Sequence, residues 1–204
     1  MARKSSSWRD RQERDPYVIQ ARRDGWRSRA VYKLEQILQK EKLLKPDMTC
    51  IDLGAAPGSW SQYVSTKLKG RCRIIAIDLL PLDNLPSVEL IQGDFTSDET
   101  LGILMAKIDG AAVDLVMSDM APNISGYKVV DQPRSIYLAE LALDLAGKIL
   151  TRNGNFICKL FQGQGTDAFV AESRKAFERV RIMKPKASRS GSSEVYLVAR
   201  NYQL

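Results

Sequence analysis

The chain contains no histidine among its 204 residues, and this absence limits the chemistry that it can perform. Catalytic dyads that pair serine or cysteine with histidine are excluded, and so is any zinc site that depends on imidazole ligands. Proton transfer must therefore use Lys, Asp, Glu, Tyr or Cys side chains.

Cysteine is also scarce, because the chain has only Cys50, Cys72 and Cys158, and none of them forms a CxxC pair. An odd number without a pairing pattern favours a reducing compartment and predicts no metal site. No apolar run approaches the roughly 20 residues that span a bilayer. The N-terminus, MARKSSSWRDRQERD, lacks the apolar core of a secretory signal. We therefore expect a soluble cytoplasmic protein with no membrane partner.

Positive charge is concentrated in two blocks around a mildly acidic centre. Residues 1–33 hold ten Lys/Arg against four Asp/Glu, residues 174–189 hold seven against one, and residues 34–173 hold thirteen against eighteen. The first block also contains three aromatic residues, Trp8, Tyr17 and Trp26. One basic run is as often a solvated surface as a binding site. Two blocks with aromatic residues favour a polyanion, because phosphates attract Lys/Arg and bases stack on aromatic rings.

Short apolar runs alternate with amphipathic segments after residue 45. The runs predict strands at 49–55, 73–79, 88–92, 113–119, 154–161, 179–183 and 194–200. The segments between them predict helices at 58–69, 97–107, 131–150 and 166–177. This alternation indicates an α/β fold with a mostly parallel sheet that is covered by helices on both faces.

The length favours a single domain, residues 1–204, with three parts. Residues 1–15 are expected to be a flexible basic segment, 16–45 a helical segment and 46–204 the α/β body. Within the helical segment, a helix at 28–40 has one apolar stripe, formed by Ala30, Val31, Leu34, Ile37 and Leu38. Nothing in the sequence indicates a coiled coil, and we expect a monomer.

The ends of the first three strands favour a nucleoside ligand. The first strand leads into the Gly-rich turn DLGAAPGSW, where Gly54 and Gly58 have GxxxG spacing. The dinucleotide fingerprint GxGxxG is absent, which argues against an NAD-dependent oxidoreductase. Asp78 ends the second strand and can accept both ribose hydroxyls, and Asp94 after the third strand can accept an adenine amine. Either carboxylate alone would suit a turn, but three such ends favour a nucleoside without phosphates, such as S-adenosylmethionine.

Lys159 is the most informative residue, because it lies inside the apolar run FICKLF and an unpaired buried ammonium is costly. Asp119, at the end of the preceding strand, is its natural partner. Lys33 lies at the border of the apolar stripe of the first helix and can turn toward the sheet. Glu194 opens the last strand. Taken singly, these residues also fit a strand-end lysine, a solvated helix lysine and a turn residue.

Together these segments resemble the FtsJ/RrmJ (RlmE) family of ribosomal RNA ribose 2′-O-methyltransferases. The resemblance is carried by SRAVYKL (28–34), DLGAAPGSWSQY (52–63), GDF (93–95), SDMAPN (118–123), KLFQG (159–163) and KPKASRSGSSEVYLV (184–198). It implies a Rossmann-like class I methyltransferase fold with a seven-stranded sheet. It also implies S-adenosylmethionine as cofactor and large-subunit ribosomal RNA or the large ribosomal subunit as partner, with a uridine as target.

The resemblance also assigns roles to individual residues. The catalytic Lys-Asp-Lys-Glu tetrad of the family falls on Lys33, Asp119, Lys159 and Glu194. The cofactor contacts of the family fall on Gly58, Trp60, Asp78, Asp94 and Asp119. We add Gly54 and Pro57 of the same Gly-rich turn as candidate cofactor-binding residues. Our hypothesis is that Lys159 orients the 2′-oxygen or acts as base, that Lys33 supports it, and that the two carboxylates position the amines.

Other functions compete with this interpretation. Amino-methylating enzymes carry an (Asp/Asn)-Pro-Pro-aromatic segment, whereas residues 119–122 read DMAP. Methylation at cytosine C5 needs a nucleophilic cysteine, and Cys50 and Cys158 lie in apolar strands. Two alternatives stay open, namely 2′-O-methylation of tRNA and a non-catalytic RNA-binding factor in ribosome assembly. The filled tetrad positions favour an enzyme.

Overall fold

The computed structural model describes residues 13–204, so most of the expected flexible segment, including Trp8, lies outside the described residues. Its elements, in chain order, are α2 (Pro16–Arg23), α3 (Val31–Glu41), β1 (Met48–Leu53), α4 (Ser59–Lys67), β2 (Cys72–Asp78), β3 (Val88–Gln92), α5 (Asp98–Ile108), β4 (Val113–Ser118), α6 (Lys128–Ile149), β5 (Leu150–Phe161), α7 (Thr166–Ala176), β6 (Phe177–Met183) and β7 (Glu194–Tyr202).

All seven predicted strands are confirmed, and they form one sheet in the order β3-β2-β1-β4-β5-β7-β6. Strand β7 is antiparallel to both of its neighbours, and the other pairs are parallel. The chain adds β2 and β3 on one side of β1 and then returns to place β4 on the other side. At this switch point the loops after β1 and β4 diverge, and in α/β sheets the crevice between such loops is where ligands bind.

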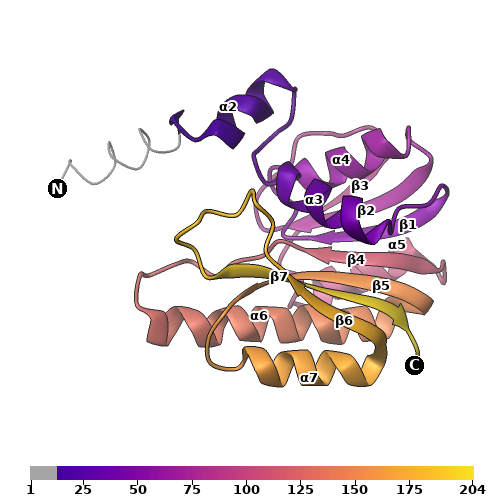
Figure 1. The fold of residues 1–204 in the computed structure, drawn as a ribbon. Coiled ribbons are helices and arrows are strands. Elements are labelled where there is room, and N and C mark those ends of the chain that lie inside the picture. The colour runs from indigo at the N-terminus through magenta and orange to yellow at the C-terminus, as the bar shows by residue number, and fades with distance from the viewer. Residues whose placement is uncertain (1–12) are drawn as a thin grey trace.

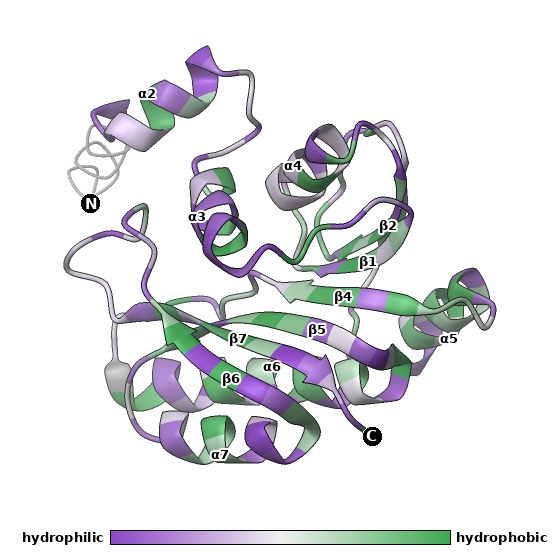
Figure 2. Ribbon diagram, turned by 45° about the vertical axis from the view of Figure 1, so that its right-hand side comes forward, coloured by the Kyte–Doolittle hydropathy of each residue, from purple (hydrophilic) through white to green (hydrophobic). Residues whose placement is uncertain are grey.

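Helices cover both faces of the sheet, as expected. Helices α3 and α4 pack on one face, around Leu34, Ile37 and Tyr63. Helices α5, α6 and α7 pack on the other face, where Leu104 and Phe169 are buried. Figure 1 shows α3 and α4 above the sheet and α6 and α7 below it. Figure 2 shows hydrophobic residues along β4 and β7, as expected for strands buried on both faces.

Most element boundaries differ from the predicted ones by a few residues, and two of the differences have a visible cause. Helix α6 begins at Lys128 rather than at 131, although Pro133 lies inside it. The carboxylate of Asp131 accepts the backbone N–H groups of residues 125 and 126, both at 2.9 Å, and so fixes the turn that starts the helix. Strand β5 begins at Leu150 rather than at 154, because Leu150 pairs with Val113 ahead of the polar segment TRNG (151–154), and the ladder with β4 resumes, after a register shift, at Asn155.

The helical N-terminal segment divides into α2 and α3. Asp15 caps α2 by accepting the N–H of Tyr17 at 3.0 Å, and its carboxylate pairs with Arg29. The guanidinium of Arg29 also donates to the carbonyl of Ala187, so α2 is tied to the loop before β7. In Figure 1 this loop, α2 and the loop after β4 lie at the same end of the sheet. No helix within residues 13–204 is long and apolar enough to cross a membrane.

Candidate functional site

The Gly-rich turn after β1 brings the backbone against the loop after β4. Gly54 has a φ of 71°, and a Cβ there would lie 2.4 Å from Cγ of Met120, so only glycine fits without displacing that loop. Gly58, with a φ of 98°, is the N-cap of α4. Arg27 donates to the carbonyl of Pro57 at 3.0 Å. The predicted residues Gly54, Pro57 and Gly58 therefore shape the turn through their backbone.

The first turn of α4 offers free backbone donors. The N–H groups of Ser59 and Trp60 have no acceptor within the described part of the chain. The indole of Trp60 is buried, donates Nε1–H to the carbonyl of Ala30 at 3.0 Å, and packs 5.7 Å from the ring of Tyr196. The predicted Trp60 contact with a cofactor can therefore involve its backbone, while its side chain belongs to the core.

Asp78 and Asp94 lie at the neighbouring ends of β2 and β3. The Asp78 carboxylate accepts the N–H groups of Ala56 and Leu80, both at 2.8 Å, and so holds the Gly-rich turn in place. Asp94 accepts the N–H and the hydroxyl of Thr96 through the single oxygen Oδ1. Each carboxylate fills the turn role that the sequence allowed, and each keeps lone pairs for a ligand.

A cleft of about 470 Å³ opens at the switch point, within the range of roughly 300–1,000 Å³ that is typical of ligand sites. Its lining includes Gly54, Asp78, Asp94, Phe95, Asp119, Met120 and Tyr137. A small cavity of about 20 Å³ shares Gly54 and Asp119 with this cleft and extends to Trp60 at the start of α4. Carboxylates for hydroxyls and an amine, apolar walls and a helix N-terminus fit a nucleoside that carries a carboxylate, as S-adenosylmethionine does.

Asp52 is a buried carboxyl group beside the same cavity. Its Oδ2 accepts the hydroxyl of Ser61 at 2.7 Å and the backbone N–H of Ser61 at 3.1 Å. Its Oδ1 has no partner among the described residues. Burial raises the pKa of Asp52 to about 7, against the opposing effect of the Ser61 hydrogen bonds.

Lys159 is buried and paired with Asp119, the partner inferred from the sequence. Its Nζ lies 3.1 Å from Oδ1 of Asp119 and donates to the backbone oxygen of the same residue at 2.5 Å. The Lys159 side chain is 8% exposed. The ammonium therefore replaces its hydration with a carboxylate and a carbonyl, as a buried cation requires.

Lys33 and Glu194 form a second ion pair near the first. Nζ of Lys33 lies 2.8 Å from Oε2 of Glu194, and the two side chains are 13% and 11% exposed. The other oxygen of Glu194 accepts the hydroxyl of Ser188 at 2.7 Å. The structure thus brings the four predicted tetrad residues together as two ion pairs, Lys159–Asp119 and Lys33–Glu194.

Tyr196, which was not among the site residues predicted from the sequence, links the two pairs. Its buried hydroxyl donates to Oδ1 of Asp119 at 2.6 Å, and Nζ of Lys33 lies 5.8 Å from its ring centroid. Burial acts to raise the pKa of Asp119, but the charges of Lys159 and Lys33 and the Tyr196 hydrogen bond hold it below its usual value. Residues two apart on a strand share a face, so the position of Tyr196 relative to Glu194 was a usable signal.

The N-terminal basic block reaches the second ion pair. A cleft of about 210 Å³ is lined by Arg29, Lys33, Arg189, Ser192 and Glu194. Two of the aromatic residues proposed for base stacking already have partners, since Tyr17 packs 5.5 Å from Tyr32 and Trp26 packs 5.7 Å from Tyr63. Both remain half-exposed, so each ring has part of its surface free.

The cysteines are poorly suited to nucleophilic chemistry. All three are free thiols, and burial raises the pKa of Cys158 to about 12 and that of Cys50 well above its usual value. A nucleophilic cysteine needs the opposite shift, so the site does not fit methylation at cytosine C5. Within residues 13–204, no group of three or more carboxylate or thiol side chains is arranged to hold a metal ion.

Comparison with known proteins relates this geometry to one family. A model of the FtsJ-like methyltransferases matches residues 26–202. Ribosomal RNA large subunit methyltransferase E of Legionella pneumophila (strain Corby) is 52% identical over 206 residues, with all of both chains covered. The protein of the same name from Pseudomonas fluorescens (strain Pf0-1) is 49% identical, with 100% of this chain and 98% of that one covered.

Solved structures agree with the sequence comparison. A crystal structure described as a ribosomal RNA methyltransferase from Plasmodium falciparum superposes with a TM-score of 0.80 at 29% identity, covering 87% of this chain and 98% of that one. Human methyltransferase-like protein 13, in complex with SAH, shares the fold with a TM-score of 0.58 at 17% identity, covering 84% of this chain and 80% of that one.

Proposed function

The chain belongs to the FtsJ-like methyltransferase family, and on that premise we propose that it methylates a ribose 2′-hydroxyl of large-subunit ribosomal RNA, at a uridine, with S-adenosylmethionine as methyl donor. Relatives that match its whole length at about half identity carry the name ribosomal RNA large subunit methyltransferase E, which supports the RNA substrate. We propose a monomer that acts in the cytoplasm on this RNA or on the assembling large subunit.

The observation that carries the proposal is the position of the two ion pairs. Asp119 lines the cleft at the switch point, whereas Lys33 and Glu194 line the basic cleft beside it. Lys159 and Tyr196 both contact Asp119 and lie between the two clefts. A reaction centre for RNA methylation needs this arrangement, with a nucleoside cofactor on one side and a polyanion on the other.

For the cofactor, we assign Asp78 to the ribose hydroxyls and Asp94 to the adenine amine, because carboxylates accept hydrogen bonds from both groups. The free N–H groups of Ser59 and Trp60 would bind the methionine carboxylate, which the dipole of α4 also attracts. Gly54 would let the cofactor approach the backbone closely, and the Asp119 carboxylate would attract the positively charged sulfonium of the cofactor. When bound, S-adenosylmethionine supplies a methyl group that is already activated on its sulfonium.

The protein must then hold the 2′-oxygen in line and manage its proton. Two oxygens of Asp119 engage Nζ of Lys159, which leaves a third position on this nitrogen for the 2′-oxygen. We assign Lys159 to orient that oxygen or to accept its proton. Lys33 adds positive charge, and Asp119 and Glu194 hold the two amines in position.

The reaction class is tested with methyl-labelled S-adenosylmethionine and three substrates, namely undermethylated large ribosomal subunits, naked ribosomal RNA and bulk tRNA. One part of the product is digested to nucleosides, which are separated to identify the labelled one, and the modified position is mapped on the intact RNA from the other part. We expect label in a 2′-O-methyl nucleoside from the subunit. Label on a base would overturn the proposal, label in tRNA would change the substrate, and no label despite cofactor binding would favour an assembly factor.

The role of Lys159 is tested by Lys159→Ala and Lys159→Arg. Lys159→Ala should lower kcat by roughly 10²-fold or more, the usual contribution of a positioned acid–base group, without loss of cofactor affinity. Lys159→Arg should be similarly poor, because arginine stays protonated and has a different shape. The control is Lys175→Ala, since the Lys175 side chain is 71% exposed and pairs with Glu172 on the surface. Near-normal turnover by Lys159→Ala would make the assignment wrong.

A further inference from the structure

A second cleft, of about 510 Å³, lies at the same end of the sheet and has no part in the cofactor assignment. It is bounded by the start of α6, by the turn after β5 and by the turn before β7. Apolar and aromatic side chains from these segments supply part of its lining, namely Ile124, Val129, Pro133 and Phe161. Polar side chains that can donate or accept hydrogen bonds supply the rest, among them Gln162, Gln164, Ser192 and Ser193.

The walls of this cleft are held by two consecutive residues of α6. Gln132 donates from Nε2 to the carbonyl of Phe161 at 2.7 Å and to that of Gln164 at 3.1 Å. Asp131 accepts the N–H groups of Ser125 and Gly126. The turn after β5 and the loop before α6 are therefore fixed to one helix before any ligand binds, as a recognition site requires.

The cleft adjoins the two ion pairs. Phe161 lies two residues beyond Lys159 on β5, so both side chains belong to the same face of the strand. Ser192 lines this cleft and also the basic cleft that contains Lys33 and Arg189. The loop after β4 lines the cofactor cleft up to Asn123 and this second cleft from Ile124 onward, so a single loop separates the two.

We propose that this second cleft binds the nucleobase of the target nucleotide, an inference that rests on the proposed function. Lys159 and Lys33 are recessed, with side chains 8% and 13% exposed, so a ribose within a stacked helix cannot bring its 2′-oxygen to them. The nucleotide must leave the stack, and burial of its base offsets the cost of unstacking. The base stacks on Phe161, its polar edge meets Gln162 or Gln164, and its phosphate lies toward the exposed Arg189.

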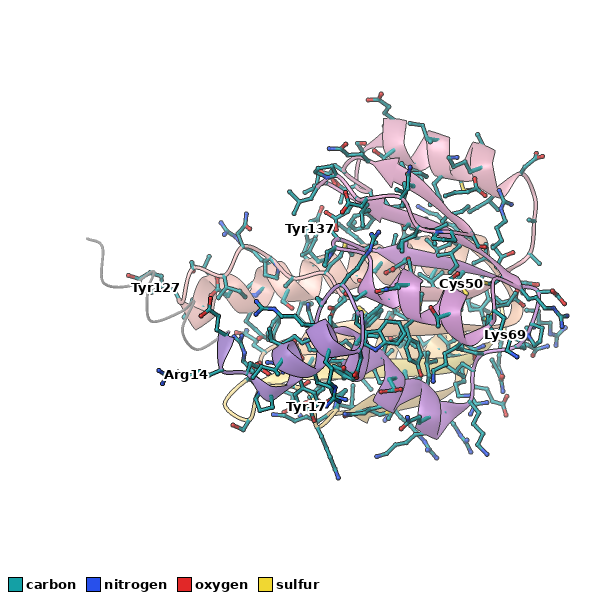
Figure 3. The ribbon with its side chains drawn as sticks, turned by 90° about the horizontal axis from the view of Figure 1, so that it is seen from above. Arg14, Tyr17, Cys50, Lys69, Tyr127 and Tyr137 are labelled. Carbon is teal, nitrogen blue, oxygen red and sulfur yellow. The ribbon has the colours of Figure 1, made fainter. Side chains whose placement is uncertain are left out.

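The surroundings of the cleft suit an unpaired RNA segment. Tyr127 is 74% exposed, and Figure 3 shows it at the outer end of the loop before α6, projecting from the body of the protein. Val129 is 88% exposed at the start of α6. Exposed aromatic and apolar side chains beside a basic cleft are typical of sites that bind splayed bases. A protein segment in this cleft would not account for its continuity with the Lys33 and Arg189 cleft.

The test compares Val129→Glu with Val130→Glu. Val129 lines the cleft and Val130 does not, yet the two variants place the same charge at adjacent, exposed positions. Both lie in the first turn of α6, where a carboxylate is favourable, so both should fold and bind S-adenosylmethionine normally. The Val129→Glu carboxylate should displace the base from Phe161 and so lower kcat/KM for RNA at least about tenfold, the value of one lost base stack, while Val130→Glu stays close to the parent protein.

A second substrate identifies the base as the occupant. Once the modified position is mapped, an RNA that keeps its ribose but lacks its base at that position is assayed. With this RNA, kcat/KM of the parent protein should decrease to the value that Val129→Glu shows with the complete RNA. The kcat/KM of Val129→Glu should decrease little further, because its base contact is already lost. Equal losses in Val129→Glu and Val130→Glu, or indifference of the parent protein to the missing base, would overturn the cleft assignment alone. Absence of any RNA methylation by the parent protein would overturn the proposed function and this inference with it.

Discussion

Asp52 is a buried carboxyl group whose raised pKa should make the stability of the protein depend on pH. Asp52 is 1% exposed, and one of its two carboxyl oxygens has no hydrogen-bond partner in the described chain. Burial is the main cause that raises its pKa from 3.8 to about 7, the Ser61 hydrogen bonds oppose the rise, and the charges of Asp119 and Asp78 add to it. The folded protein therefore holds a proton on Asp52 over a pH range in which the unfolded chain does not.

The sign of the effect follows from proton linkage. Between about pH 4 and pH 7 the folded state binds more protons than the unfolded state, so stability falls as pH rises and levels off above the folded pKa. A shift of about three units at 1.36 kcal/mol each corresponds to ~4 kcal/mol in total, of which about 3 kcal/mol separates pH 5 from pH 8. Asp119, whose pKa is lowered, contributes in the opposite direction.

The assay is urea unfolding of the parent protein and of Asp52→Asn at pH 5 and pH 8. Asparagine has nearly the same shape and does not titrate, so effects of Asp119 and other groups are common to both proteins. The free energy of unfolding should decrease from pH 5 to pH 8 by on the order of 3 kcal/mol more in the parent protein than in Asp52→Asn. If the free energy of unfolding depended on pH identically in the two proteins, the reasoning would be refuted, because Asp52 would then have the same pKa in the folded and the unfolded state.

Gly54→Ala should weaken S-adenosylmethionine binding at least about tenfold by calorimetry, because its positive φ costs roughly 1–2 kcal/mol and its Cβ must displace Met120. Gly102→Ala is the control, since no atom lies within 4 Å of its Cβ, and equal affinities in the two variants would contradict the prediction. RNA affinity should fall steeply with salt concentration, and Arg189→Ala should reduce the slope of log affinity against log salt by about one. A salt-insensitive affinity would argue against phosphate contacts by the basic blocks.

The strands and helices could be predicted from the sequence, whereas the order of the strands in the sheet could not. Strands buried on both faces appear as continuous apolar runs, and for this reason all seven were found. The order of the sheet depends on which crossovers the chain takes, and periodicity carries no information about that. Helix α6 begins three residues before the predicted start at 131, because the Asp131 carboxylate holds the turn before the helix through a contact that no periodicity shows.

The candidate site was predictable where it depends on strand ends and not where it depends on side-chain contacts. Asp78 and Asp94 follow parallel neighbours, so their proximity follows from the topology alone. That Lys33 pairs with Glu194 while Lys159 pairs with Asp119 depends on how α3 packs against β7. No local pattern encodes that packing. The burial of the Trp60 side chain also depends on the packing of α3, because its indole lies beneath that helix.

The antiparallel strand β7 explains why the four charged residues meet. Its register with β5 places Tyr196 opposite Lys159 and Glu194 opposite Phe161. Because side chains alternate between faces, a slip of one residue would turn Tyr196 and Glu194 away from Asp119 and Lys33. A parallel strand at this place would reverse the chain and carry Glu194 to the opposite edge of the sheet. The reversal of β7 therefore delivers a carboxylate to the carboxyl ends of the parallel strands, where the basic cleft and the clefts proposed for the cofactor and for the base lie.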